Sequence, residues 1–281
     1  MNNNVIYCIE CGSACDKEAR FCMHCGHKLE KASEEFTIKK YFNDFGLEYT
    51  AESDSQSTIP SILDVASFMV ENYSYIYDFL NQLKWSINGN NTKCSYRYNK
   101  NNEEHIIKLV RKMENCFILN NVYIDKTASK VYCSVATTPI VINFLNGKYL
   151  EMYIQKNTEN VLKEMAKKYN CDYEIAGNVH IHNDEFANEL DHVFRLGNTM
   201  FWIEDKSGKN FDPNKSYNIG KKLKFIPNRF LMVMLTQSNQ SCENLEYMYQ
   251  CYASNGENFI NKLRKMIDDN MKNAVAKTTA A

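Results

Sequence analysis

Three residues in the C-terminal half, Asp191, Glu204 and Lys206, have the types needed for phosphate chemistry at a metal ion. Two carboxylates can hold one or two Mg²⁺ or Mn²⁺ ions, which prefer oxygen ligands, and the backbone carbonyl of Asp205 could add another. An ammonium can orient a water molecule or stabilise charge on a phosphate. We expect desolvation and a neighbouring cation to lower the pKa of Lys206, which favours the role on water.

The stretch 188–208 must position these residues, and its pattern predicts a β-hairpin. Two apolar runs flank Gly197-Asn198, a dipeptide that supplies positive φ at little cost. Side chains alternate along a strand, so Glu204 and Lys206 share one face. Asp191 lies on the partner strand and faces them if the register is right. The alternative is a surface hairpin on which these charged side chains only form a face exposed to solvent.

Four cysteines near the N-terminus form a second candidate site. They make two Cys-x-x-Cys pairs separated by ten residues. Zn²⁺ takes four soft ligands at tetrahedral corners, and two close pairs of thiolates supply them, so the pattern predicts a short zinc ribbon with one closed, structural zinc. The expected ligands are Cys8, Cys11, Cys22 and Cys25. Cys15 and His24 break the paired symmetry and are not expected to bind the metal.

Composition sets the broad class. The 281 residues are 44% hydrophobic and 24% charged, with a net charge of −1, so any nucleic-acid surface must be local. No apolar run reaches the roughly 18 residues of a membrane span, and the start does not resemble a signal peptide. Eleven cysteines, an odd number with only two pairs, suit a reducing compartment. We expect a cytoplasmic protein without membrane contact.

The order of expected elements predicts a multidomain α+β or α/β protein. The segments are a zinc ribbon (1–30), a linker (31–59), a middle α+β domain (60–138), a C-terminal domain (139–272) and a frayed tail (273–281). A short amphipathic turn at 36–45 could dock, but most of the linker is polar.

In the middle domain, we expect a helix from Pro60 to the Asn-Gly cluster at 88–91, a strand at 94–98 and a helix at 103–119. A hairpin of 122–124 and 130–135 follows. This order is compatible with a winged-helix-like unit, although other small α+β domains give similar strings.

In the C-terminal domain, we expect a helical region ending at 169 and then three strands. A helix, a buried strand and a final helical region of two helices complete the order α-β-β-β-α-β-α. The strands are 173–182, 189–195 and 200–205, followed by helix 214–224, strand 230–235 and helices 243–252 and 258–268.

This order resembles the PD-(D/E)xK restriction-endonuclease-like superfamily, whose pattern is an acidic residue, a hairpin spacer and then (D/E)-x-K. Here the pattern is Asp191, twelve residues, and Glu204-Asp205-Lys206. The finer strings GKYLE (147–151), NELD (188–191) and IEDKSG (203–208) are similar to the nuclease domain of CRISPR ancillary nucleases that cyclic oligoadenylates activate. The resemblance covers roughly 139–270. Residues 1–138 depart from the family's sensor domain.

Glu151 lies on the flank of the buried helix stripe, so it can reach the sheet edge as a further metal ligand. An ordinary surface glutamate is the alternative reading for Glu151.

A local basic patch follows the hairpin. Between Lys206 and Arg229 there are six lysines and one arginine but a single acid, Asp212, as expected of a surface that follows a phosphate backbone. A solvated loop is the alternative. Besides Lys206, the lysines are Lys209, Lys215, Lys221, Lys222 and Lys224.

The expected function is therefore a metal-dependent endonuclease, a hydrolase of phosphodiester bonds with DNA as the expected substrate. The resemblance adds a role in bacterial or phage-directed defence, raises the odds of a homodimer and leaves open which activator or partner residues 1–138 bind. The alternative function is a non-catalytic adaptor in which a nuclease-like fold serves as a platform. The converging charges argue against it, because a platform does not need them.

Overall fold

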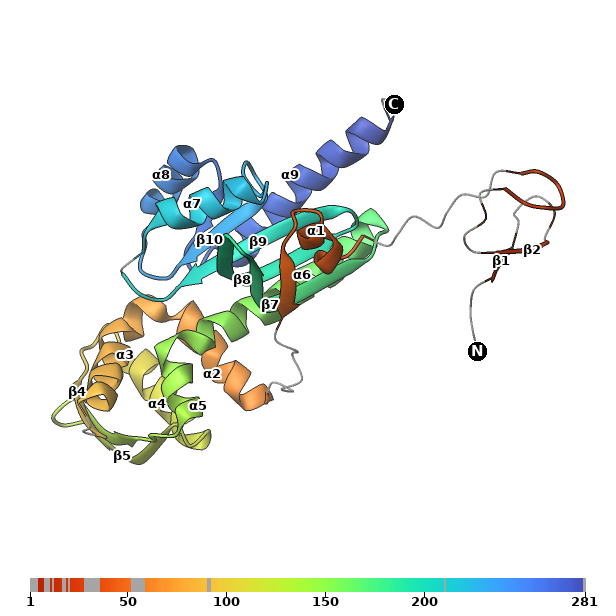
Figure 1. Ribbon diagram of the computed structural model, residues 1–281. Helices are drawn as coiled ribbons and strands as arrows, with labels where there is room; N and C mark the ends of the chain where they lie inside the picture. Colours follow the sequence, from red (N-terminus) through yellow and green to blue (C-terminus); the bar gives the residue numbers. More distant parts are fainter. Residues whose placement is uncertain are drawn as a thin grey trace.

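The computed structural model describes residues 5–7, 11, 13–16, 19, 21–27, 36–51, 59–89, 92–209 and 211–279 (Figure 1). The helices are α1 (Ile38–Asn43), α2 (Pro60–Glu71), α3 (Tyr73–Asn88), α4 (Glu103–Asn115), α5 (Pro139–Asn143), the π-helix η1 (Phe144–Lys148), α6 (Tyr149–Tyr169), α7 (Pro213–Lys222), α8 (Asn239–Tyr249) and α9 (Phe259–Thr279). Among these residues, none of the helices combines the length and apolar character that a membrane span needs.

The described strands form three sheets of mixed α+β architecture. A hairpin of β1 (Val5–Tyr7) and β2 (Ala14–Asp16) stands near the N-terminus. The middle of the chain forms an antiparallel sheet in the order β4-β6-β5, made of β4 (Lys93–Arg97), β5 (Leu119–Asp125) and β6 (Lys130–Val135). The largest sheet has the order β11-β10-β9-β8-β7-β3, made of β3 (Glu48–Ala51), β7 (Tyr173–Asn183), β8 (Phe186–Leu196), β9 (Thr199–Lys206), β10 (Phe230–Met234) and β11 (Tyr252–Ser254).

The six-stranded sheet contains the predicted α-β-β-β-α-β order as α6-β7-β8-β9-α7-β10. The strands β7, β8 and β9 pair antiparallel, whereas β9, β10 and β11 pair parallel. Strand β10 is buried along its whole length, as a central parallel strand should be. The sheet therefore changes from antiparallel to parallel at β9, the strand that carries Glu204 and Lys206.

Residues 36–51, expected to be mainly linker, belong to this sheet. Helix α1 buries Ile38 and Phe42, and β3 pairs antiparallel with β7, with Glu48 opposite His182. The short polar strand gave no clear apolar alternation, because β3 is an edge strand whose residues are exposed or half-buried. The linker prediction is wrong for this segment, while the amphipathic turn at 36–45 does dock.

Both faces of the six-stranded sheet are covered. One buried cluster joins Phe194, Phe201 and Ile203 of the sheet to α6 and α9. The other joins Val193 and Trp202 to α1, α7 and α8. Because consecutive residues of β8 and β9 enter different clusters, the two strands carry different side chains to their two faces.

The middle unit follows the predicted order of helix, strand, helix and hairpin. The long helix expected from Pro60 is divided into α2 and α3 at Asn72, which has non-helical backbone angles. Strands β4 and β5 flank β6, and the register of β5 shifts between Asn120 and Tyr123. Cys94, Val131 and Cys133 point inward beneath the helices.

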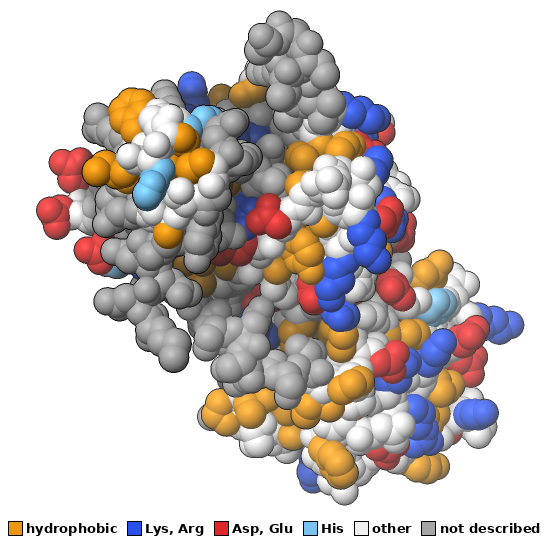
Figure 2. Space-filling model, turned by 90° about the vertical axis from the view of Figure 1, so that its right-hand side faces the viewer, with side chains coloured by type: hydrophobic (Ala, Val, Ile, Leu, Met, Phe, Trp, Pro, Cys, Tyr) orange, Lys and Arg blue, Asp and Glu red, His pale blue; other side chains and the backbone are white. Residues whose placement is uncertain are grey.

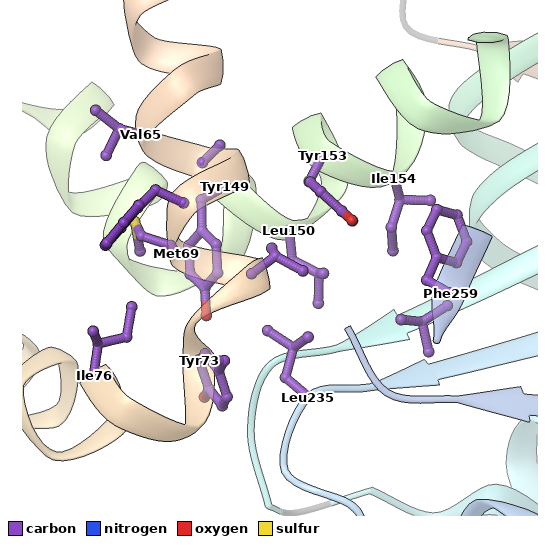
Figure 3. Close-up of a cluster of buried hydrophobic side chains, with 14 of the residues drawn as sticks. Val65, Met69, Tyr73, Ile76, Tyr149, Leu150, Tyr153, Ile154, Leu235 and Phe259 are labelled. Atoms are coloured by element: carbon purple, nitrogen blue, oxygen red, sulfur yellow. The ribbon is translucent and has the colours of Figure 1, made fainter. Parts of the chain in front are cut away.

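The middle unit and the C-terminal unit share one hydrophobic core. Figure 3 shows Met69 of α2 and Tyr73 of α3 beside Tyr149 of α6, with Leu235 beyond β10 close by. The loop before α9 also reaches this boundary, because a Cβ built on Gly256 would lie 2.8 Å from Cγ1 of Val70. The expected boundary at 138/139 is thus bridged by continuous packing.

The end of the chain departs from the expected elements. The helix expected at 243–252 ends earlier, at Tyr249. The short strand β11, which was not predicted, begins at Tyr252. Gln250 follows with left-handed backbone angles, which close the helix. Helix α9 continues to Thr279, so the frayed tail expected at 273–281 is wrong for the backbone up to that residue.

Candidate active site

Asp191, Glu204 and Lys206 meet at one place on the six-stranded sheet. The register pairs His192 with Ile203, so Asp191 and Glu204 follow on the opposite face, where β9 approaches its end. The hairpin predicted from the sequence and its register are confirmed. The structure therefore brings together the three residues that the chemistry requires.

The ammonium of Lys206 lies between the two carboxylates. Its Nζ is 2.9 Å from Oε1 of Glu204 and 3.2 Å from Oδ2 of Asp191. The backbone amide of Asp205 also donates a 2.8 Å hydrogen bond to Oδ2 of Asp191. Asp191 is thus fixed by its neighbouring strand, and the two carboxylates converge on one positive charge.

An open cavity of about 460 Å³ gives access to this cluster. Besides the three residues, it is lined by Glu189 of β8, by Asp212 at the N-cap of α7 and by Lys215 of α7. The lining is mostly polar and charged. Such a cavity suits a hydrated, charged ligand better than an apolar one.

The site holds its negative charge at a free-energy cost. Burial, followed by the charge of Asp191, raises the pKa of Glu204 to about 7, although Lys206 acts in the opposite direction. A pair of close carboxylates in a poorly solvated place favours either a proton or a cation. The electrostatics therefore select a positive partner between Asp191 and Glu204.

The pKa of Lys206 departs from our expectation. Burial lowers it, but the charges of Asp191 and Glu204 outweigh burial and raise the pKa above its ordinary value. The expected lowering required a neighbouring cation, and the two carboxylates alone shift the pKa of Lys206 in the opposite direction. Lys206 is a protonated ammonium at neutral pH.

A buried polar network lies on the opposite face of the same strands. Nε2 of His192 is 3.1 Å from Oδ2 of Asp205, and Nδ1 of His192 is 3.0 Å from Oε1 of Gln155 in α6. Burial raises the pKa of Asp205 to about 6, with His192 opposing the shift. Sequence reasoning missed His192, although a histidine inside an apolar strand was an available signal.

Glu151 is not brought into the cavity. Its Oε2 accepts a hydrogen bond of 2.8 Å from Nζ of Lys148, and its charge contributes to the raised pKa of Asp205. In the part of the chain that the structure describes, no three carboxylate or histidine ligand atoms lie within 4.8 Å of one another. Metal binding by Glu151, and by the backbone carbonyl of Asp205, stays a prediction.

The predicted lysine patch is spread over several surfaces. Lys215 lines the cavity, whereas Nζ of Lys209 lies 5.1 Å from the ring centre of Tyr77. Lys222 and Lys224 lie over the rings of Phe186 and Phe45. Lys221 is exposed. Figure 2 shows that basic and acidic side chains alternate on one face of the molecule, so positive charge does not dominate that face.

Three of the four predicted zinc ligands come together. The ligand atoms of Cys11, Cys22 and Cys25 all lie within 4.8 Å of one another, and Cys8 lies outside the described residues. Hydrogen bonds from the backbone of His24 and Cys25 lower the pKa of Cys22 to about 6. Thiolates favoured in this way are ready ligands for a soft metal ion such as Zn²⁺.

Comparisons with known proteins give the fold. No family model and no curated protein matches the sequence. Protein VC1899 from Vibrio cholerae is similar in structure, with a TM-score of 0.60 and 14% identity over 89% of this chain and 65% of that one. Can2 from Sulfobacillus thermosulfidooxidans, solved in complex with cyclic tetra-adenylate (cA4), is also similar in structure. Its TM-score is 0.57 and its sequence identity is 16%, over 90% of this chain and 68% of that one.

The chain thus spans somewhat less than two thirds of the length of the Vibrio protein. The likeness also extends well beyond residues 139–270, where the sequence had placed it. At these identities it shows a related mixed α+β fold.

Proposed function

We propose that this protein is a metal-dependent nuclease that hydrolyses phosphodiester bonds of nucleic acid, with DNA as the expected substrate. One observation carries the proposal: the carboxylates of Asp191 and Glu204 converge on the ammonium of Lys206 at 3.2 and 2.9 Å, in an open polar cavity. The related fold of Can2, in its complex with cyclic tetra-adenylate, supports the proposal. The proposal includes a role in defence against foreign nucleic acid, as the sequence resemblance implied.

The donor set fits a hard divalent cation. Asp191 and Glu204 offer only oxygen atoms, and the raised pKa of Glu204 reflects a need for positive charge beside it. Mg²⁺ usually binds through one or two carboxylates and retains several waters, so two protein ligands suffice. When bound, the ion supplies Lewis acidity to a phosphoryl oxygen and lowers the pKa of a water molecule.

Each residue then has a definite task. The amide of Asp205 holds the Asp191 carboxylate in place, and Glu204 is held by Lys206. Lys206 stays protonated and stabilises the negative charge that grows on the phosphate as the oxygen of a water molecule bonds to phosphorus. The attacking water gives one proton to solvent, the bond from phosphorus to one ester oxygen breaks, and that oxygen leaves with a proton taken from solvent.

A cleavage assay tests this function. Purified protein is incubated with plasmid DNA, single-stranded DNA or RNA and with Mg²⁺ or Mn²⁺. Each reaction is run with and without cyclic tetra-adenylate, so that a requirement for an activator is detected. We expect Asp191→Asn, Glu204→Gln and Lys206→Ala to lower the rate by on the order of 10²-fold or more. Glu185→Gln and Lys167→Ala change exposed charges elsewhere and serve as controls.

Two results would contradict the proposal. One is wild-type protein that cuts none of the substrates under any of these conditions. The other is cleavage that persists at the wild-type rate in the three site variants, since a contaminating nuclease would give that result.

Sedimentation of the same preparations tests the expected homodimer.

A further inference from the structure

The outer face of the three-stranded sheet exposes two tyrosines side by side. Tyr123 of β5 lies directly opposite Tyr132 of β6, and their ring centres are 6.2 Å apart with planes inclined by 27°. Their exposed fractions are 63% and 38%. Tyrosine rings with this much exposure bury only part of their apolar area in the fold, so packing alone does not account for both of them.

The opposite face of this sheet already has its partner. Cys94, Val131 and Cys133 are buried beneath α3 and α4, and Figure 1 shows these helices on one side of the sheet. Side chains alternate along each strand, so the tyrosines point away from these helices. The aromatic face is therefore an outer surface of the folded unit.

Three cations lie on the same outward face as the two rings. Lys93 and Arg97 of β4 are exposed, and Arg97 lies opposite Lys130 of β6. Like charges directly across a strand pair destabilise a sheet, so this arrangement is unfavourable for folding. The Nζ of Lys130 is also 6.0 Å from the ring centre of Tyr132. On its other side Lys130 lies opposite Asp125 of β5, so one carboxylate faces three cations on this surface, and an anionic ligand would balance the remaining positive charge.

The one acid among the outward-facing residues of these strands is already engaged. Oδ1 of Asp125 accepts hydrogen bonds from the backbone amides of Thr127 and Ala128, which hold it in the turn. Beside Tyr132, the outward neighbour on β4 is the small residue Ser95. The rings are thus bordered by a short side chain, by cations and by this one carboxylate.

We propose that this surface, Lys93, Arg97, Tyr123, Lys130 and Tyr132, binds single-stranded nucleic acid. Unpaired bases can stack on the tyrosine rings, and the phosphates can pair with the cations, which is the chemistry used by single-strand-binding sheets. Duplex DNA does not fit this chemistry, because its bases are stacked on each other and are not available to the rings. The surface is in a different sheet from Asp191 and Glu204, so the inference does not depend on the nuclease.

Fluorescence anisotropy tests the surface without cleavage. The full chain carrying Glu204→Gln, in EDTA, is titrated against labelled mixed-sequence single strands of DNA and of RNA and against a duplex. We expect single strands to bind more tightly than duplex. Comparison of the affinities for single-stranded DNA and single-stranded RNA shows which of the two the surface prefers. Tyr123→Ala and Tyr132→Ala should each weaken binding about 5- to 100-fold, as expected for loss of one stacked base.

Conservative and control variants separate stacking from folding. Tyr123→Phe and Tyr132→Phe keep a ring and should retain near wild-type affinity. Trp85→Ala removes an aromatic side chain that is 69% exposed on α3, away from the sheet surface, and should have no effect. Circular dichroism of each variant confirms that the fold is intact.

The salt dependence tests the cations. Lys93→Gln and Lys130→Gln should each reduce the slope of log Kd against log salt by about 0.7, the value for one phosphate contact on a single strand. The inference is overturned if the double variant Tyr123→Ala/Tyr132→Ala binds single strands as wild type does. It is equally overturned if duplex is preferred, or if no strand binds at low salt. None of these results concerns cleavage.

Discussion

The hydroxyl of Tyr73 donates a hydrogen bond of 2.6 Å to the backbone carbonyl of Ser207, the residue that follows Lys206. Tyr73 is the first residue of α3 in the middle unit, and Ser207 begins the loop after β9. The hydroxyl of Tyr149 is buried beside the same contact. The middle unit thus holds the chain directly after the candidate catalytic lysine.

Tyr73→Phe should therefore affect the site as well as stability. Loss of this hydrogen bond should reduce the free energy of unfolding by about 1 kcal/mol and lower kcat for cleavage, because the end of β9 is held less firmly. Urea unfolding and steady-state kinetics measure the two effects. Tyr75→Phe, on an exposed part of the same helix, is the control, and equal kinetics in both variants would disprove the coupling.

Mg²⁺ binding should depend on pH near neutrality. Burial and Asp191 raise the pKa of Glu204 to about 7, so below that pH the ion must displace a proton from Glu204. Affinity should rise by up to about tenfold per pH unit towards pH 7 and level off above it. Calorimetric titration with Mg²⁺ between about pH 6 and 8 measures this, and a flat profile would show that Glu204 is not a ligand.

Without metal, the raised pKa of Glu204 makes the folded protein less stable as the pH rises, whereas the rising pH makes Mg²⁺ binding stronger. A folded-state pKa above the ordinary value means that ionised Glu204 destabilises the fold, so its contribution becomes unfavourable as the pH rises through about 5 to 7. Glu204→Gln should remove this pH dependence in EDTA.

The buried pair of His192 and Asp205 should contribute strongly to stability. His192→Ala leaves the Asp205 carboxylate buried without its partner, at an expected cost of about 3 kcal/mol in the free energy of unfolding. Because Asp205 lies between Glu204 and Lys206, cleavage should fall too.

A double-mutant cycle with Asp205→Asn isolates this interaction. We expect a coupling energy above about 1 kcal/mol. Strictly additive effects would mean that the two side chains act independently.

Close packing at Gly256 should be intolerant of a methyl group. A Cβ there would lie 2.8 Å from Cγ1 of Val70 and 2.9 Å from its backbone oxygen, and the backbone of α2 cannot easily move away. Gly256→Ala should cost about 1–3 kcal/mol of stability. Thermal unfolding measures the change against Gly208→Ala, where the new methyl group would meet nothing within 4 Å.

The cysteine cluster should hold about one zinc ion per chain. Cys11→Ser and Cys22→Ser should each reduce the zinc content measured by native mass spectrometry, because three ligands hold the ion less firmly than four. Cys8→Ser tests the fourth predicted ligand. Cys116→Ser, in the middle unit, should leave the zinc content unchanged.

The sequence predicted best what periodicity and chemistry both specify. Alternation along β8 and β9 with the Gly197 turn determined the hairpin, and the hairpin placed Asp191 opposite Glu204 and Lys206. The direction and size of pKa shifts were harder to predict from the sequence. The pKa of Lys206 depends on two carboxylates at particular distances, which spacing in the sequence does not provide.

Short or edge elements were the least predictable. Strand β3 is a polar edge strand, and β11 has only three residues, so neither shows the apolar alternation of a strand with one buried face. The partner of His192 was also hidden, because Gln155 is distant in sequence and comes from a helix. Such contacts arise from tertiary packing alone.

The pairing of β3 with β7 means that the chain enters the large sheet, leaves it to build residues 60–135, and then returns. The middle unit is therefore an insertion within the sheet unit. A fragment beginning at residue 139 would present β7 as a bare edge, open to pairing with another chain. The edge of the sheet is covered by a contact between distant parts of the sequence, and such non-local contacts slow folding.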